Sequence, residues 1–328
     1  MADVVTGAAR RTLFERAGAA PAARGRRPVS LLPRARRNAG AWAFLIGAVL
    51  AFSFFSWYPI VREVIMSFQK PLYGGGYTFA GWSNYVRIFR DPTFWQAWRN
   101  TLEFTVLALV LGYAIPFIVA IVLNELRHAR GYLRILVYLP VMLPPASALL
   151  LFVYFYNPQY GLFDDVLHFL HLPTSQWVFQ PGNGFISIAM LSVVIASTWM
   201  NMGSATLIYL AALQNIPGEL YEAAELEGAG IFRRIRHVTI PQTRLILILL
   251  LMLQVVATMQ MFIESFVLTN GGGGVGDNTQ SVVMLIYQYA FAMSGASNYN
   301  SASALGVVLM LVLAVFSGGF LWVTRERG

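Results

Sequence analysis

The stretch that organises the chain is Asn215–Pro241, NIPGELYEAAELEGAGIFRRIRHVTIP, a polar interval between two long apolar runs. Pro217 suits the start of a helix, because its missing N–H costs nothing there. Glu219 and Glu222 fall in the opening turns of that helix, where the helix dipole favours negative charge. Gly228 is expected to end it. We interpret the stretch as a cytoplasmic docking element.

The composition around this interval is that of a membrane protein. Apolar residues make up 57% of the chain and charged residues 12%, which excludes an ordinary soluble domain. A membrane-spanning helix needs roughly 20 mostly apolar residues. Six stretches are long enough for one crossing each: Ala39–Ile60, Leu102–Leu123, Leu133–Tyr156, Phe185–Leu213, Leu245–Leu268 and Ala302–Val323. The sequence therefore predicts an all-α membrane protein with about six transmembrane helices.

The predicted transmembrane domain covers residues 39–328. Residues 1–38, rich in Arg, Ala, Gly and Pro, are expected to form a poorly ordered cytoplasmic tail. Within the third span, Pro140, Pro144 and Pro145 remove backbone hydrogen bonds and are expected to kink the helix.

The basic residues predict the orientation in the membrane. Short cytoplasmic loops carry an excess of Arg and Lys, and an N-terminus inside the cell places 18 of the 23 basic residues on the cytoplasmic side. We therefore expect a multi-pass protein of the bacterial cell membrane with both termini in the cytoplasm. The net charge of +8 reflects this topology, since the basic residues are not interleaved with exposed aromatic residues as a nucleic-acid interface requires.

The central stretch resembles the "EAA" loop of permease subunits of bacterial ATP-binding-cassette importers. The matching residues are Glu222, Ala223, Ala224, Gly228, Ala229 and Pro241. In that family the loop forms a coupling helix, which docks on the ATPase subunit and transmits its motion. Ile235, Val238 and Leu245 stand where Phe, Ile and a second Pro are usual, so packing around the loop departs slightly from the family pattern.

Other segments resemble the carbohydrate-uptake branch, which includes maltose and glycerol-3-phosphate permeases. They are Gly81–Tyr85, Phe94–Thr101, Leu139–Asp164, Gly271–Gly274 and Tyr287–Phe291. The resemblance implies a type I importer permease fold and half of a translocation pathway for a di- or oligosaccharide. It also implies a second permease subunit, two ATPase subunits that bind ATP-Mg, an extracytoplasmic solute-binding protein and no cofactor on this chain.

The chain itself is not expected to hydrolyse ATP or to catalyse another reaction. A P-loop requires GxxxxGK[ST], whereas Lys70 in FQKPL is the only lysine. The absence of cysteine excludes disulfides and thiolate sites. Asp164, Asp165, His168 and His171 match no metal-ligand spacing and are interpreted as solvated loop residues, so no metal site is expected.

Polar and aromatic residues within the spans are candidates for the solute pathway, because burying polar groups at membrane depth is costly. They are Trp199, Asn201, Gln254, Gln260 and Glu264. Amides, a carboxylate and an aromatic ring suit a polyhydroxylated ligand. The alternative for each is interhelical hydrogen bonding without any solute, and for Glu264 we expect a structural or gating role.

Two other functions remain open from the sequence. The same architecture can carry glycerol-3-phosphate or another small solute, although no basic residue lies at depth within the spans to bind a phosphate. An ion-coupled secondary transporter is expected to show ionisable residues at the midplane or an inverted repeat, and neither is visible.

Overall fold

The computed structural model describes residues 31–72, 75–126, 130–181, 186–292 and 298–325. Its elements in chain order are α2 (Leu31–Phe52), η1 (Ser53–Trp57), α3 (Tyr58–Ser67), β1 (Gln69–Pro71), β2 (Tyr77–Phe79), α4 (Ser83–Arg90), α5 (Pro92–Glu125), α6 (Arg130–Met142), α7 (Pro145–Phe155), α8 (Leu162–Phe169), η2 (Trp177–Phe179), α9 (Ile188–Gln214), α10 (Gly218–Leu226), α11 (Ile231–Arg234), η3 (Ile235–Thr239), α12 (Ile240–Thr258), α13 (Ile263–Leu268), η4 (Val275–Asp277), α14 (Val282–Tyr287), η5 (Gln288–Ala292) and α15 (Tyr299–Arg325). The chain divides into two units, Met1–Pro59 and Ile60–Gly328.

The first unit is an apolar helix with exposed side chains. Phe44, Leu50 and Phe55 are all more than half exposed, as expected for a helix whose solvent is lipid. Residues 31–38 belong to α2, so this part of the expected disordered tail is helical. Pro33 is compatible with that, because proline is tolerated in the first turn of a helix. The rest of the expected tail, residues 1–30, lies outside the described residues.

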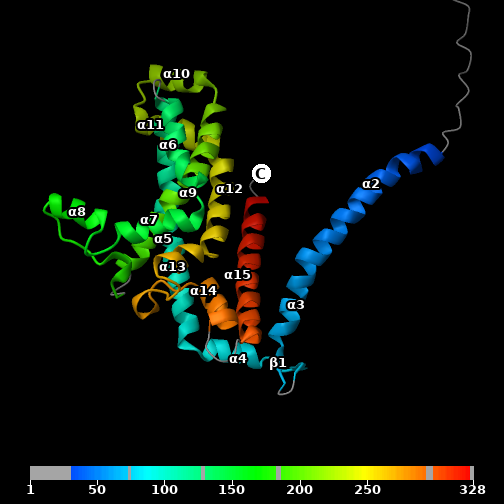
Figure 1. Ribbon diagram of the computed structural model, residues 1–328. Helices are drawn as coiled ribbons and strands as arrows, with labels where there is room; N and C mark the ends of the chain where they lie inside the picture. The colour runs from blue at the N-terminus through cyan, green and yellow to red at the C-terminus, as the bar shows by residue number, and fades with distance from the viewer. Residues whose placement is uncertain (1–30, 73–74, 127–129, 182–185, 293–297, 326–328) are drawn as a thin grey trace, which may run out of the picture. The chain divides into compact units, whose positions relative to one another are not determined.

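The second unit is built around α5 and α9, which run side by side (Figure 1). Asp91 caps α5 by accepting a hydrogen bond from the Thr93 N–H at 2.9 Å, and Ser187 caps α9. Between them lies a core that includes Phe104, Met190 and Val193, each at most 2% exposed. The two capped helices thus form the frame on which α6, α7 and α12 pack.

In the described residues, five helices are long and apolar enough to cross a membrane, or six if the bent pair α6 and α7 forms one span. The sequence predicts a single kinked helix from Leu133 to Tyr156, whereas α6 and α7 meet at an angle of 97°. Pro144 and Pro145 cannot donate to the carbonyls of Pro140 and Val141, so two successive helical hydrogen bonds are missing. The third span is therefore broken into two helices with a sharp turn between them and is not one kinked helix.

The fifth predicted span is also interrupted. α12 ends at Thr258, Phe262 has φ −140°, and α13 begins at Ile263. The Ser281 hydroxyl donates to the Met261 carbonyl at 2.6 Å, which satisfies a carbonyl that the break leaves without a helical partner. The predicted continuous helix to Leu268 is thus two helices, and α13 packs against α7.

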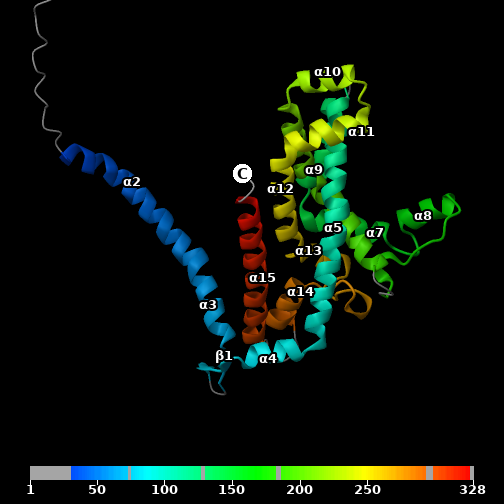
Figure 2. The same cartoon turned by 180° about the vertical axis from the view of Figure 1, so that it is seen from behind.

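The two ends of the second unit are formed by different elements. α10 and α11 lie at one end, and α4 with the β1–β2 hairpin lies at the other (Figures 1 and 2). α5 runs between these ends, while α15 packs on α4 and α14. The docking element predicted from the sequence therefore lies at the opposite end of the unit from α4, which precedes α5.

Candidate functional site

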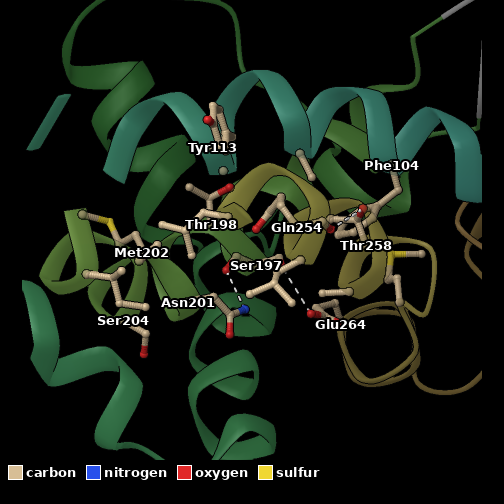
Figure 3. A pocket seen from close by; sticks show the side chains of 18 of the residues that line it. Phe104, Tyr113, Ser197, Thr198, Asn201, Met202, Ser204, Gln254, Thr258 and Glu264 are labelled. Carbon is tan, nitrogen blue, oxygen red and sulfur yellow. Dashed lines mark hydrogen bonds between the residues drawn. The ribbon is translucent and has the colours of Figure 1, made fainter. Parts of the chain in front are cut away.

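A polar cavity of about 360 Å³ lies between α5, α9 and α12. Its polar lining side chains are Tyr113, Ser197, Thr198, Asn201, Ser204, Gln254, Thr258 and Glu264 (Figure 3). α5 contributes Tyr113, α12 contributes Gln254, and α13 places Glu264 at the cavity wall. The cavity therefore draws its polar groups from four helices.

The α9 side of the cavity follows the helical repeat. Ser197, Asn201 and Ser204 stand at i, i+4 and i+7, which share one face of a helix. The Asn201 amide donates to the Ser197 carbonyl at 2.9 Å, and the Ser197 hydroxyl donates to Glu264 Oε1 at 3.1 Å (Figure 3). This second bond ties α9 to the short helix that follows the break in the fifth span.

Gln254 faces this row from α12. Within the described residues no hydrogen bond involves its carboxamide, so the amide can donate to and accept from a solute. Gly112 of α5 makes room for it, because a Cβ there would lie 3.0 Å from Gln254 Nε2 and 3.4 Å from Thr198 Oγ1. The absence of a side chain at Gly112 therefore leaves the space that the Gln254 amide occupies.

Two residues predicted for the pathway do not line the cavity. Trp199 is half-buried and packs edge-on against Phe152, with the ring centroids 5.3 Å apart. Gln260 is exposed, and its amide donates to the Val256 carbonyl at 2.9 Å. The structure thus places Asn201, Gln254 and Glu264 at one cavity, while Trp199 and Gln260 lie outside its lining.

The cavity opens to one side of this single chain. Asn201 and Ser204 are exposed although they lie within an apolar helix. Among the described residues that line the cavity, no lysine or arginine is present. The surroundings are therefore neutral apart from the Glu264 carboxylate.

The predicted docking element forms α10, whose ends are defined by backbone chemistry. Pro217 precedes the first helical residue, and Glu219 lies in the first turn. Gly228 follows the helix with φ +75°, a conformation that glycine adopts without strain. The Ala229 N–H donates to the Ala224 carbonyl at 2.9 Å, which completes the C-terminal cap.

The surface of α10 is open. Glu222 and Ala223 are exposed, and Leu226 is 91% exposed. The Tyr221 hydroxyl forms a hydrogen bond with Thr239 Oγ1 at 3.0 Å, and Glu225 forms an ion pair with Arg234. α10 is thus held to the following segment while its outer face remains free.

That following segment contains a π-helical turn, Ile235–Thr239, which is separated from Pro241 by Ile240. Pro241 has no N–H and its ring crowds the carbonyl four residues earlier, which widens the helix locally. The helical path continues through this turn into α12, so α10 is connected by one polypeptide path to the helix that carries Gln254.

Comparisons with known proteins identify the family. Residues 112–323 match the family described as binding-protein-dependent transport system inner membrane component. The chain is 35% identical over 279 residues to the probable ABC transporter permease protein YurN of Bacillus subtilis, covering 84% of this chain and 92% of that protein. It is 31% identical over 271 residues to the trehalose/maltose transport system permease protein MalF of Thermococcus litoralis, covering 83% of this chain and 86% of that protein.

A solved structure shows the same fold. A chain of the bacterial alginate ABC transporter, in complex with the alginate pentasaccharide-bound periplasmic protein, superposes with a TM-score of 0.77. The two chains are 22% identical, and the match covers 90% of this chain and 98% of that one. This superposition shows the fold, and the family match together with the relatives shows that the chain belongs to the inner membrane components of binding-protein-dependent transport systems.

Proposed function

We propose that this chain forms half of the translocation pathway of an ATP-driven importer for a di- or oligosaccharide, which an external binding protein delivers. The observation that carries the proposal is the cavity between α5, α9 and α12, whose polar lining groups are amides, hydroxyls and the Glu264 carboxylate. Several relatives are named as permeases for glycans, among them the arabinooligosaccharides transport system permease protein AraP of Bacillus subtilis, at 32% identity over 285 residues.

The chemistry of the cavity suits a sugar. A sugar hydroxyl both donates and accepts hydrogen bonds, and so do the Gln254 carboxamide and the Asn201 side chain. Glycerol-3-phosphate needs cationic groups at its phosphate, whereas the described lining residues offer Glu264 and no basic side chain. A neutral glycan is therefore the better match to this cavity.

Two exposed surfaces of this chain, the open side of the cavity and the outer face of α10, are where partner subunits are expected to bind. A second permease subunit closes the side on which Asn201 and Ser204 are exposed. Two ATPase subunits, which bind ATP-Mg, dock on the coupling loop around Glu222, Ala223, Ala224, Gly228, Ala229 and Pro241. The chain itself needs no cofactor, and both of its termini lie in the cytoplasm.

The proposed pathway is tested by comparing two glutamine variants of neighbouring positions. Gln254→Ala removes an amide from the cavity, whereas Gln260→Ala removes one that points away from it. Loss of one hydrogen bond of ~1 kcal/mol predicts roughly a fivefold decrease in apparent sugar affinity for Gln254→Ala. Uptake of radiolabelled oligosaccharides by cells that express the complete transporter, with Gln260→Ala as the control, measures this. Equal uptake by both variants contradicts the assignment.

The coupling loop is tested separately. Gly228→Asp forces a side chain into the left-handed region and adds a charge at the end of α10, while Gly230→Asp adds the same charge at a φ of −68°. We expect Gly228→Asp to remain in the membrane but to lose uptake and to release the ATPase in a pull-down. Gly230→Asp should lose much less. Normal uptake by the Gly228→Asp variant refutes this role.

A further inference from the structure

Two adjoining hollows lie where α5 emerges from the membrane, at the end of the unit opposite α10. One is a polar cavity of about 540 Å³, whose lining includes Trp95, Gln96 and Asn278. The other is an apolar groove of about 330 Å³ along Leu102, Val106 and Ile186. Arg99 and Glu103 line both hollows, so a single elongated ligand can occupy the two together.

The hollows follow one face of α5. Trp95, Arg99, Leu102 and Val106 succeed one another at spacings of four, three and four residues, which place them in a row along the helix. In this row the charged Arg99 precedes the apolar run of the second span, which begins at Leu102 and includes Val106. The change from polar to apolar lining therefore coincides with the expected edge of the hydrocarbon layer.

The polar cavity has walls that are fixed by hydrogen bonds. The Gln96 amide donates to the Gly276 carbonyl at 2.6 Å, and the Asn278 amide donates to the Gln180 carbonyl at 2.7 Å. The Ser187 N–H donates to Glu103 Oε1 at 2.6 Å. These bonds join α5 to two segments that are distant in sequence, so the cavity is built before any ligand enters.

The charges at the shared wall have opposite signs. Arg99 and Glu103 stand one helical turn apart and interact electrostatically. A zwitterionic ligand complements such a pair, because its anionic group can lie on the guanidinium and its cationic group on the carboxylate. A purely anionic ligand meets repulsion from Glu103, and a neutral one gains no charge-assisted hydrogen bond of its own charge with either side chain.

We propose that these hollows hold one phospholipid with a phosphoethanolamine headgroup, drawn from the leaflet in which α5 begins. Its phosphate lies at Arg99, its ammonium group at Glu103, and one acyl chain follows Leu102, Val106 and Ile186. Trp95, which is 60% exposed, borders the headgroup at the depth where tryptophan is enriched in membrane proteins. The inference requires only that α5 spans the bilayer, so it stands independently of the transported solute.

The test is native mass spectrometry of the purified transporter complex after exchange into mild detergent, with and without added phosphatidylethanolamine. Arg99→Gln removes the phosphate contact, and Val106→Trp fills the groove from an exposed position. Val110→Trp is the matched control, because Val110 and Val106 are 61% and 58% exposed on the same helix and Val110 does not line the groove. Phosphatidylglycerol replaces phosphatidylethanolamine in a parallel titration.

The expected result is one retained phosphatidylethanolamine for each copy of this chain. Loss of one charge-assisted hydrogen bond predicts retention about tenfold weaker in Arg99→Gln. We expect a similar loss in Val106→Trp, wild-type retention in Val110→Trp and weaker binding of phosphatidylglycerol. Unchanged retention in both variants overturns the inference. Loss of the second permease from the Val106→Trp complex overturns it in favour of a subunit interface, and binding of a free oligosaccharide that Arg99→Gln abolishes overturns it in favour of a carbohydrate site.

Discussion

Gly112 controls the clearance between α5 and the Gln254 amide. A methyl group at this position would lie 3.0 Å from Gln254 Nε2, closer than side chains normally approach. Gly112→Ala is therefore expected to displace the amide and lower initial uptake severalfold, without loss of fold, because alanine favours a helix over glycine by ~0.5–1 kcal/mol. Initial uptake and the thermal unfolding temperature measure the two effects.

The control for this variant is Gly318→Ala on α15, where an added Cβ meets nothing within 4 Å. It should transport like the wild type. If Gly112→Ala and Gly318→Ala transport equally well, the clearance at Gln254 does not matter for the pathway.

Glu264 provides a second test at the scale of the residue. Its carboxylate accepts a hydrogen bond from the Ser197 hydroxyl, and the amide oxygen of a glutamine can accept the same bond. For a neutral sugar we expect Glu264→Gln to keep uptake within about threefold of the wild type and Glu264→Leu to lose more, because it leaves Ser197 without a partner. Uptake rates of both variants decide this. A loss in Glu264→Gln as large as in Glu264→Leu means that the negative charge itself is required.

The cavity was only partly predictable from the sequence. Polarity within an apolar helix singles out Asn201 and Gln254, and both line the cavity. Trp199 is two positions from Asn201, which places it on the far side of the helix, and this spacing argues against a shared site. Ser197 stands four residues before Asn201 and therefore shares its face of the helix, although a serine within an apolar helix is not by itself a signal of a site. Gln260 lies beyond the end of α12 at Thr258, so it is outside the helical repeat that places Gln254 at the cavity.

At the scale of elements, α10 depends on few contacts with the rest of the chain. The Tyr221 hydroxyl bonds to Thr239 in the π-helical turn that continues into α12. Tyr221→Phe keeps the ring and removes the bond, and a lost bond of ~0.5–1.5 kcal/mol predicts a modest decrease in stability. We expect a larger effect on coupling, measured as ATP hydrolysis that is less stimulated by the sugar-loaded binding protein.

Glu225→Gln is the control for α10, because it removes the ion pair with Arg234 at a position where the Glu225 side chain is 59% exposed. Exposed ion pairs contribute ~0–1 kcal/mol, so stimulation should remain near that of the wild type. If ATP hydrolysis in the Tyr221→Phe complex is stimulated as strongly as in the wild type, the Tyr221–Thr239 hydrogen bond does not transmit motion.

The helices themselves differ in how far the sequence specifies them. Apolar length predicts the spans within α5 and α9, whereas the starts of these helices after the capping residues Asp91 and Ser187 come from the structure. Pro144 and Pro145 predict a kink in the third span but not its 97° angle, because the angle depends on what α7 packs against. The break before α13 has no proline or glycine to mark it, and it is supported by Ser281 from a later segment, which only the tertiary structure brings near.

At the scale of the whole molecule, the orientation can be tested with introduced cysteines, since the chain has none of its own. Ser83→Cys lies on α4 and Glu222→Cys on α10, and both positions are exposed. A membrane-impermeant maleimide is expected to label position 83 in intact cells and position 222 only after permeabilisation. Labelling yields on gels before and after permeabilisation measure this. The reverse pattern contradicts cytoplasmic docking at α10.

The fold class was predictable because few backbone arrangements can span a bilayer. Backbone groups cannot remain unsatisfied in lipid, so long apolar stretches must form helices. The number of spans and the family therefore follow from apolar length and the Glu222–Pro241 pattern. What the sequence leaves undefined is how broken helices pack, and this packing is what shapes the cavity.

The central claim is that this chain transports only as part of an ATP-driven assembly. The most direct measurement is to purify the tagged chain in mild detergent, identify the proteins that accompany it, and assay oligosaccharide uptake in vesicles with and without ATP. We predict recovery of a second permease and an ATPase, and uptake that requires both ATP and the binding protein. A chain that transports alone after reconstitution, without ATP, contradicts the account.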